Sequence, residues 1–175
     1  MRLPQRATRA VLCGLLFCGA PMIGAEPSPV GLWRTIDDHT HRPRGVVRIY
    51  QENGSFVAKI ETSFDPEERV ARCEKCSDDR KNAPIMGLVI MRGITKHGSE
   101  YTGGEILDPD TGSIYRCRFT LSSDGGKLFL RGFLGISLLG RTQTWVRTDN
   151  AAEELPPVTK GVSTASLAGG SQHEK

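Results

Sequence analysis

The sequence predicts an all-β protein, an antiparallel up-and-down barrel of about eight strands in chain order. Two observations support this fold class. Turn-forming residues recur about every eight to twelve residues, with extended segments rich in β-branched and aromatic residues between them. In addition, no ten-residue stretch after residue 25 repeats its apolar positions with the period of a helix.

Each strand is delimited by recognisable turn chemistry. Asn53-Gly54 is a strong hairpin signal, because both central residues of a type I′ turn need a positive φ. Later turns are expected at 96–98, 108–112 and 123–126, which contain glycine, proline or aspartate. We therefore expect strands at 31–36, 45–51, 55–61, 86–93, 100–107, 113–121, 127–133 and 141–147.

Closure into a barrel is expected because a meander of antiparallel strands otherwise has two open edges. A barrel of about eight strands is filled by side chains or holds one small ligand. A two-sheet sandwich with similar hairpins is the alternative. The segment 85–91 is apolar on both faces and needs a cover on its outer side, for which the long loop 62–84 is available.

Residues 1–25 have the pattern of a cleaved export signal. Three arginines precede an apolar run at 10–20, and Ala25 follows as a small residue at the expected cleavage point, with Ala20 as the alternative. We expect a barrel domain at 26–148, a disordered tail at 149–175, and a periplasmic or secreted location.

Charge and composition exclude several classes of protein. The chain has 38% hydrophobic residues, too many for a disordered polypeptide. It has 23 Lys and Arg against 20 Asp and Glu, and removing the three signal arginines leaves 20 basic residues against 20 acidic ones. The basic residues are scattered among acidic ones, so the sequence disfavours nucleic-acid binding.

The cysteines allow several interpretations. Cys73 and Cys76 form a Cys-x-x-Cys pair, and in an oxidising compartment we expect them to form a structural disulfide. Catalytic thiol exchange and a zinc site with Cys117 and a histidine are the alternatives, as is pairing of Cys117 with either partner. We expect neither a metal nor a cofactor. Asp108, Asp110 and Gly112 are interpreted as a turn, not a calcium loop, because the further acidic ligands are missing.

The alternation of side chains along the strands predicts which residues face the barrel interior. If Trp33 points inward, alternation along the strands places Trp145 with Arg147 on one face and Tyr101 with Glu105 on another. An inward Arg131 would need an anionic partner, either Glu105 or a ligand carboxylate. The alternative is that Arg131 faces solvent while Leu128 and Leu130 fill the core.

Several motifs resemble a known bacterial family. Gly31-x-Trp33 with Arg147 resembles the lipocalin or calycin arrangement, in which a basic residue of the last strand covers the tryptophan of the first and closes the barrel. The segments 82–87 (NAPIMG), 103–109 (GGEILDP, with Gly112 and Tyr115), 130–132 (LRG) and 135–145 (GISLLGRTQTW) resemble the bacterial domain of unknown function 2147. This resemblance implies an exported lipocalin-like barrel and supplies no catalytic residues.

We therefore expect non-enzymatic binding of a small, partly apolar molecule inside the barrel. The candidate lining residues are Trp33, Tyr101, Glu105, Tyr115, Phe119, Arg131 and Trp145. Two alternatives remain open. One is a ligand-free, filled barrel that acts through protein contacts, and the other is a thiol or zinc protein centred on the Cys-x-x-Cys pair.

Overall fold

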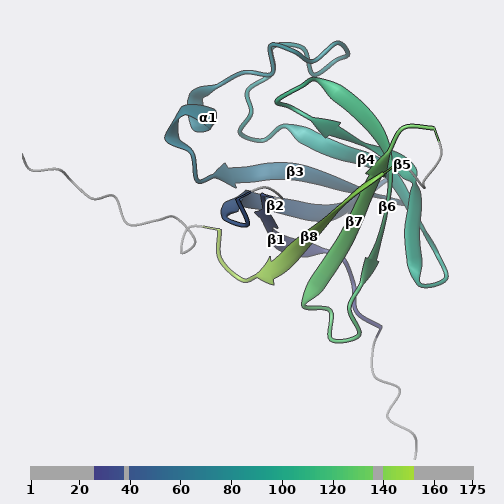
Figure 1. Ribbon diagram of the computed structural model, residues 1–175. Helices are drawn as coiled ribbons and strands as arrows, with labels where there is room; N and C mark the ends of the chain where they lie inside the picture. Colours follow the sequence, from purple (N-terminus) through teal and green to yellow (C-terminus); the bar gives the residue numbers. More distant parts are fainter. Residues whose placement is uncertain (1–25, 38–39, 136–139, 152–175) are drawn as a thin grey trace, which may run out of the picture.

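The computed structural model describes residues 26–37, 40–135 and 140–151, and within them the chain forms one closed antiparallel barrel (Figure 1). The eight strands are β1 (Gly31–Ile36), β2 (Pro43–Glu52), β3 (Ser55–Ser63), β4 (Val89–His97), β5 (Glu100–Asp108), β6 (Ser113–Leu121), β7 (Lys127–Phe133) and β8 (Arg141–Thr148). Each pairs with its neighbours in sequence, and β8 returns to pair with β1. Closure confirms the predicted barrel and contradicts the sandwich alternative. The proposed signal segment and most of the tail lie outside the described residues.

The hairpin turns follow the predicted chemistry. Asn53 and Gly54 both have positive φ (47° and 79°), as a two-residue connection between β2 and β3 requires. The boundary of β4 differs from the prediction, because this strand begins at Val89 instead of residue 86 and continues through His97. Gly87 has φ 83° and the Leu88 amide donates to the Ile85 carbonyl, so residues 85–88 form a turn before the strand starts.

A single helix, α1 (Pro66–Val70), lies in the long connection between β3 and β4. Asp65 caps it by accepting a hydrogen bond from the Glu67 amide, and Pro66 occupies the first turn, where a missing N–H costs nothing. In Figure 1 this helix and the loop that follows it lie at one end of the barrel. No helix in the described ranges is long and apolar enough to cross a membrane.

The loop predicted to cover the apolar segment does contact the barrel wall. Arg80 donates to the Val89 carbonyl of β4, and Arg92 of the same strand binds Asp78 and Asp79 in the loop. Within the turn that precedes β4, Ile85 and Leu88 are buried. The loop therefore shields backbone and apolar side chains that would otherwise meet water at this side of the sheet.

The core fills one half of the barrel. Tyr101 stacks on Phe119 with ring centroids 4.7 Å apart, and Phe56 meets Tyr101 edge-on at 5.2 Å. Inward residues of the remaining strands complete this packed half, among them Trp33, Ile49, Met91, Ile94 and Leu128, each fully buried. Towards the end that carries α1, this packing gives way to open space.

Candidate ligand-binding site

A cavity of about 780 Å³ occupies the other half of the barrel. All eight strands contribute to its lining, and most of the side chains that do so are apolar. They include Val47, Ile60, Ile90, Ile106, Leu130 and Trp145. Pockets that enclose small ligands have this size and this mainly apolar character.

A few uncharged polar groups interrupt the apolar wall. Tyr115 of β6 and Gln143 of β8 both line the cavity and are half-buried. The Trp145 indole N–H donates to Gln143 Oε1 at 3.3 Å. The amide nitrogen of Gln143 takes no part in this hydrogen bond and can donate to another group. The cavity thus has an apolar body with a small number of hydrogen-bonding groups, which can orient a bound molecule.

Charged residues line the same cavity near the strand ends, where they form an ion-pair network. Arg44 of β2 donates to Glu68 of α1 at 2.8 Å and to Asp110 of the β5–β6 turn at 2.6 Å. Burial works against the Arg44 charge, but the hydrogen bonds to Asp110 and Glu68 raise its pKa above the usual value. The network joins three separate segments of chain around the entrance.

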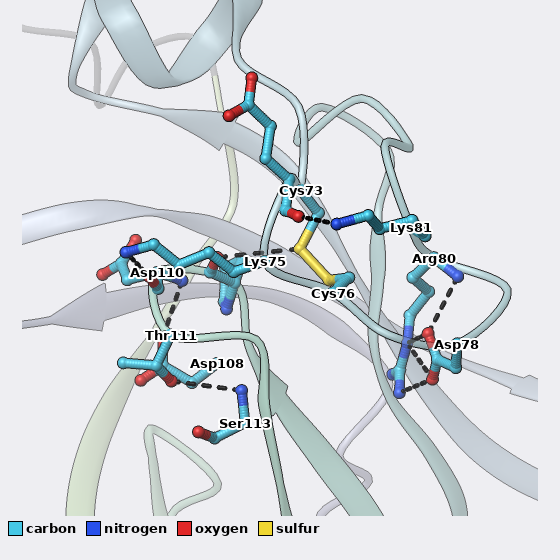
Figure 2. Close-up of a disulfide and its surroundings, with 12 residues drawn as sticks. Cys73, Lys75, Cys76, Asp78, Arg80, Lys81, Asp108, Asp110, Thr111 and Ser113 are labelled. Carbon is cyan, nitrogen blue, oxygen red and sulfur yellow. Dashed lines mark hydrogen bonds and ion pairs between the residues drawn. A yellow bond between two sulfur atoms is a disulfide. The ribbon is translucent and has the colours of Figure 1, made fainter.

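The disulfide loop is packed against the β5–β6 turn at this entrance (Figure 2). Cys73 and Cys76 form a disulfide and are almost completely buried, so this part of the prediction is confirmed. Lys75 Nζ donates to the Asp110 carbonyl at 2.7 Å, and Cys73 Sγ lies 3.7 Å from the Pro109 carbonyl oxygen. We call this contact between residues 73–76 and 108–112 the entrance clamp.

Gly112 makes the entrance clamp possible. Its φ is +71°, and a Cβ at this position would lie 2.0 Å from the Lys75 carbonyl oxygen. Any side chain would push the turn away from the disulfide loop. Gly112, predicted from the sequence to lie in a turn, therefore also permits close contact between two backbones.

The opposite end of the barrel is closed by the residues of the Gly-x-Trp motif. The Arg147 guanidinium lies over the Trp33 ring, 4.3 Å from its centroid, and donates to the carbonyls of Ser28, Val30 and Gly125. Gly31 has φ +140°, and a Cβ there would lie 2.7 Å from Arg147 Nη1. The first and last strands are thereby joined below the packed core.

The structure separates the seven candidate lining residues into three groups. Tyr115 and Trp145 line the cavity. Trp33, Tyr101 and Phe119 lie in the packed half and are almost completely buried. Glu105 and Arg131 lie on the outer face of the barrel, for the reasons given next.

The prediction that Tyr101 and Glu105 share a face is wrong, because a β-bulge separates them. Tyr101 pairs with Phe119, but Cys117, two residues earlier on β6, pairs with Gly104, three residues later on β5. The extra residue reverses the alternation along β5. Glu105 consequently points outward, where it accepts hydrogen bonds from Arg80 at 3.0 Å and Arg92 at 2.9 Å.

The inward placement of Arg131 is likewise wrong. Leu128 and Leu130 are buried on the inner face of β7, so Arg131 points outward, where it donates to Thr142 Oγ1 on β8. The alternative stated from the sequence, with the two leucines in the core, is the one the structure shows. An uncompensated arginine inside the apolar barrel would cost several kcal/mol, about 3–5.

Sequence reasoning missed Arg80, the buried centre of a charge cluster on the outer face. Its side chain is 4% exposed and forms ion pairs with Asp78 and Glu105. Hydrogen bonds from Arg80 lower the pKa of Asp78 to about 2. The Asp-Asp-Arg run was a visible signal, but nothing in the local pattern indicated that Glu105 would meet it. Gln143 was missed as well, because its role depends on the partner Trp145 and on the cavity.

The third cysteine of the described residues, Cys117, takes no part in the disulfide. Cys117 is free and buried, and its burial, together with the nearby Glu105 charge, raises its pKa to about 12. It is therefore a thiol, not a thiolate, at neutral pH. With Cys73 and Cys76 bonded to each other, their sulfur atoms offer no thiolate for zinc or for exchange.

These features together define a lipocalin-like barrel with a hollow half. The solved structure of HP1028 from the human pathogen Helicobacter pylori, described as belonging to the lipocalin family, is similar to this chain with a TM-score of 0.61. The similarity covers 70% of this chain and 84% of that chain at 21% sequence identity, so it concerns the fold alone. A comparison with curated proteins found no match.

The family is shown by its sequence model, which matches residues 31–147. The chain belongs to the family described as an uncharacterized protein conserved in bacteria, DUF2147. The matched range extends from the glycine of the Gly-x-Trp motif to Arg147, the residue that covers its tryptophan. The predicted family membership is thus confirmed.

Proposed function

We propose that the protein binds a small, partly apolar molecule in the hollow half of the barrel, without catalysing a reaction. The observation that carries this proposal is the cavity of about 780 Å³ with apolar walls. Protein interiors are normally close-packed, and voids larger than a water molecule are few. A filled barrel acting only through its surface has no need of such a space, so the hollow interior favours ligand binding over that alternative.

We further propose that the protein works outside the cytoplasm. Residues 1–25 have the pattern of an export signal but lie outside the described residues, so support comes from the Cys73–Cys76 disulfide. Disulfides persist in oxidising compartments and are rare in the cytosol. The intact mass of the protein recovered from periplasm would identify the mature N-terminus, expected after Ala25. Recovery of the unprocessed chain in the cytosol would contradict export.

A blocking substitution tests ligand binding directly. Ile60 of β3 lines the cavity, whereas its neighbour Lys59 carries its charge on the outer face, paired with Glu61. Ile60→Trp should occupy the cavity and lower the affinity for diphenylhexatriene, an apolar fluorescent probe, by about tenfold or more. Lys59→Trp introduces the same side chain outside and should leave the affinity unchanged.

The readout is probe fluorescence titrated with folded protein, and circular dichroism verifies that both variants retain the barrel. Equal affinities for the two variants would place the probe elsewhere on the surface and contradict the proposal. Native mass spectrometry of the exported protein complements the titration, because a retained ligand adds mass that disappears on denaturation.

A further inference from the structure

The chemistry of the cavity wall also restricts what its ligand can be, provided that the proposed binding function holds. Three hydroxyl groups near the entrance already donate within the protein. Ser63 donates to Glu68 at 2.7 Å, Thr35 to the Gly45 carbonyl at 3.2 Å and Thr62 to the Ser63 carbonyl at 3.5 Å. These donors are therefore occupied before any ligand enters.

Among the uncharged polar side chains on the strands that line the cavity, two have a hydrogen-bond donor that binds no described residue. The Tyr115 hydroxyl makes no hydrogen bond to any residue that the structure describes, and the Gln143 amide nitrogen makes none within that same part of the chain. Trp145 holds Gln143 Oε1, so the NH₂ group is left as a donor. The Tyr115 hydroxyl both donates and accepts. Each of these two groups can donate to an acceptor oxygen such as that of an alcohol, ester or amide.

The space beside Tyr115 exists because residue 132 is glycine. A Cβ on Gly132 would lie 3.7 Å from Tyr115 Cβ and 3.8 Å from Ile106 Cγ2, both ordinary contact distances. A longer side chain would therefore extend into the cavity next to the tyrosine ring. Gly132 leaves room there for a polar group of the ligand.

The charges that line the cavity do not select an anion. Among the described lining residues, three arginines are outnumbered by four carboxylates, and Arg44 is already paired with two of these, Glu68 and Asp110. Arg72 donates to the Asn82 carbonyl. Arg141 lies opposite Gly132 in the β7–β8 register, and both arginines are exposed to water. A charged head group drawn into the apolar part would lose its hydration without gaining an opposite charge.

We infer that the cavity takes an amphiphile with an uncharged polar group, which Tyr115 and Gln143 bind over Gly132 while the apolar part lies against Trp145 and Leu130. The ligand class is thus an alcohol, ester or amide with an apolar chain, in preference to a carboxylate or a quaternary amine. Tyr115 and Gln143 are the residues that determine this specificity.

Three molecules with the same twelve-carbon acyl or alkyl chain test this inference: monododecanoylglycerol, dodecanoate and dodecyltrimethylammonium. Each competes with diphenylhexatriene for the full-length mature protein at neutral pH, where the carboxylate is ionised. We expect monododecanoylglycerol to displace the probe at a concentration about tenfold lower than either ion. Tyr115→Phe and Gln143→Leu should each reduce this preference severalfold, whereas Thr144→Val, on the outer face of β8, should not.

The possible outcomes distinguish failure of this inference from failure of the proposed binding function on which it rests. Displacement by dodecanoate or by the cation at equal or lower concentration would overturn the inference and leave ligand binding intact. If Tyr115→Phe and Gln143→Leu both keep the full preference for the uncharged molecule, the assignment of specificity to these two residues is overturned. Failure of the probe itself to bind the wild-type protein would contradict the proposed function.

Discussion

At the scale of single residues, Arg147 holds together chain segments that are far apart in sequence. Its guanidinium covers the Trp33 indole and donates to three backbone carbonyls, at Ser28, Val30 and Gly125. Trp33 is fully buried, and its own N–H donates to the Pro29 carbonyl at 2.8 Å. Charge-assisted hydrogen bonds and the cation–π contact both favour the native arrangement of β1 and β8.

Replacing Arg147 should therefore destabilise the fold far more than replacing a surface arginine. Arg147→Ala leaves three carbonyls without their donor and uncovers Trp33, for an expected loss of about 2–3 kcal/mol in the free energy of unfolding. Arg118→Ala removes a surface pair with Glu100, 3.2 Å apart, and should cost less than about 1 kcal/mol. Urea denaturation followed by circular dichroism measures both, and similar losses would argue against the closing role of Arg147.

At the scale of elements, the entrance clamp joins the disulfide loop to the β5–β6 turn. The same turn carries Asp110, which accepts from Arg44, and Arg44 in turn binds Glu68 of α1. Residues 73–76, the turn, β2 and α1 are thus linked by successive contacts around the cavity entrance. Figure 2 shows the first of these contacts, between the disulfide loop and the turn. The position of α1 depends on these side chains, because a five-residue helix has little stability of its own.

Gly112→Ala tests the entrance clamp against a matched glycine. Both Gly112 and Gly54 have positive φ, but a Cβ at Gly54 would meet nothing within 4 Å. Gly54→Ala should therefore cost only the backbone strain of about 1 kcal/mol, whereas Gly112→Ala adds a collision with the Lys75 carbonyl and should cost about 2–4 kcal/mol. Chemical denaturation gives the two values. Equal costs would mean that the turn and the disulfide loop separate easily.

At the scale of the whole molecule, the barrel is packed at one end and hollow at the other. Aromatic residues and the Trp33–Arg147 pair fill and close the first half, and the second half contains the cavity with its charged entrance. This division lets one part supply the stability of the fold while the other part remains open. Binding sites of small molecules in barrels are commonly placed at such open ends.

The charge cluster on the outer face makes the stability of the molecule depend on pH. The pKa of Asp78 is lowered to about 2 by hydrogen bonds from Arg80, so its stabilising effect is complete above its usual value of 3.8 and is lost as the pH falls towards 2. Asp78→Asn should cost about 1 kcal/mol near neutral pH and progressively less in acid. Asp149→Asn, at an exposed carboxylate after β8, serves as the control.

Urea midpoints measured across the acid range give the comparison. Wild type and Asp78→Asn should converge as the pH approaches about 2, whereas wild type and Asp149→Asn should stay close throughout. A constant difference between wild type and Asp78→Asn would show that the carboxylate charge is not the source of the stabilisation.

Local patterns predicted most of the fold. Asn53-Gly54 and the later turns separate segments whose alternation is visible along the chain, so strand number and order needed no knowledge of distant contacts. The strand whose start was misplaced by the most residues, β4, follows the turn at 85–88, whose residues are mostly apolar and resemble a strand. Ile85 and Leu88 of this turn are buried, so the turn lacks the polar residues by which turns are usually recognised in a sequence.

The interior was harder to predict, because a single inserted residue changes which face is inward. The bulge near Gly103, whose φ is +91°, moves Glu105 to the outer face and brings it to Arg80 and Arg92. Period-two alternation contains no information about where it is interrupted. Arg131 illustrates the same limit, since only the closed barrel shows that Leu128 and Leu130 take the inner positions.

The sequence by itself determined the all-β class, the up-and-down order of the strands, the Gly-x-Trp motif and the family, since these depend on residues close together in the chain or on short motifs. Only the tertiary structure decided which side chains face the interior, that Cys73 pairs with Cys76 while Cys117 stays free, and that half of the barrel is hollow. The physical reason is that a cavity is bounded by side chains from every strand. Its shape therefore depends on the registers of all eight strand pairs at once.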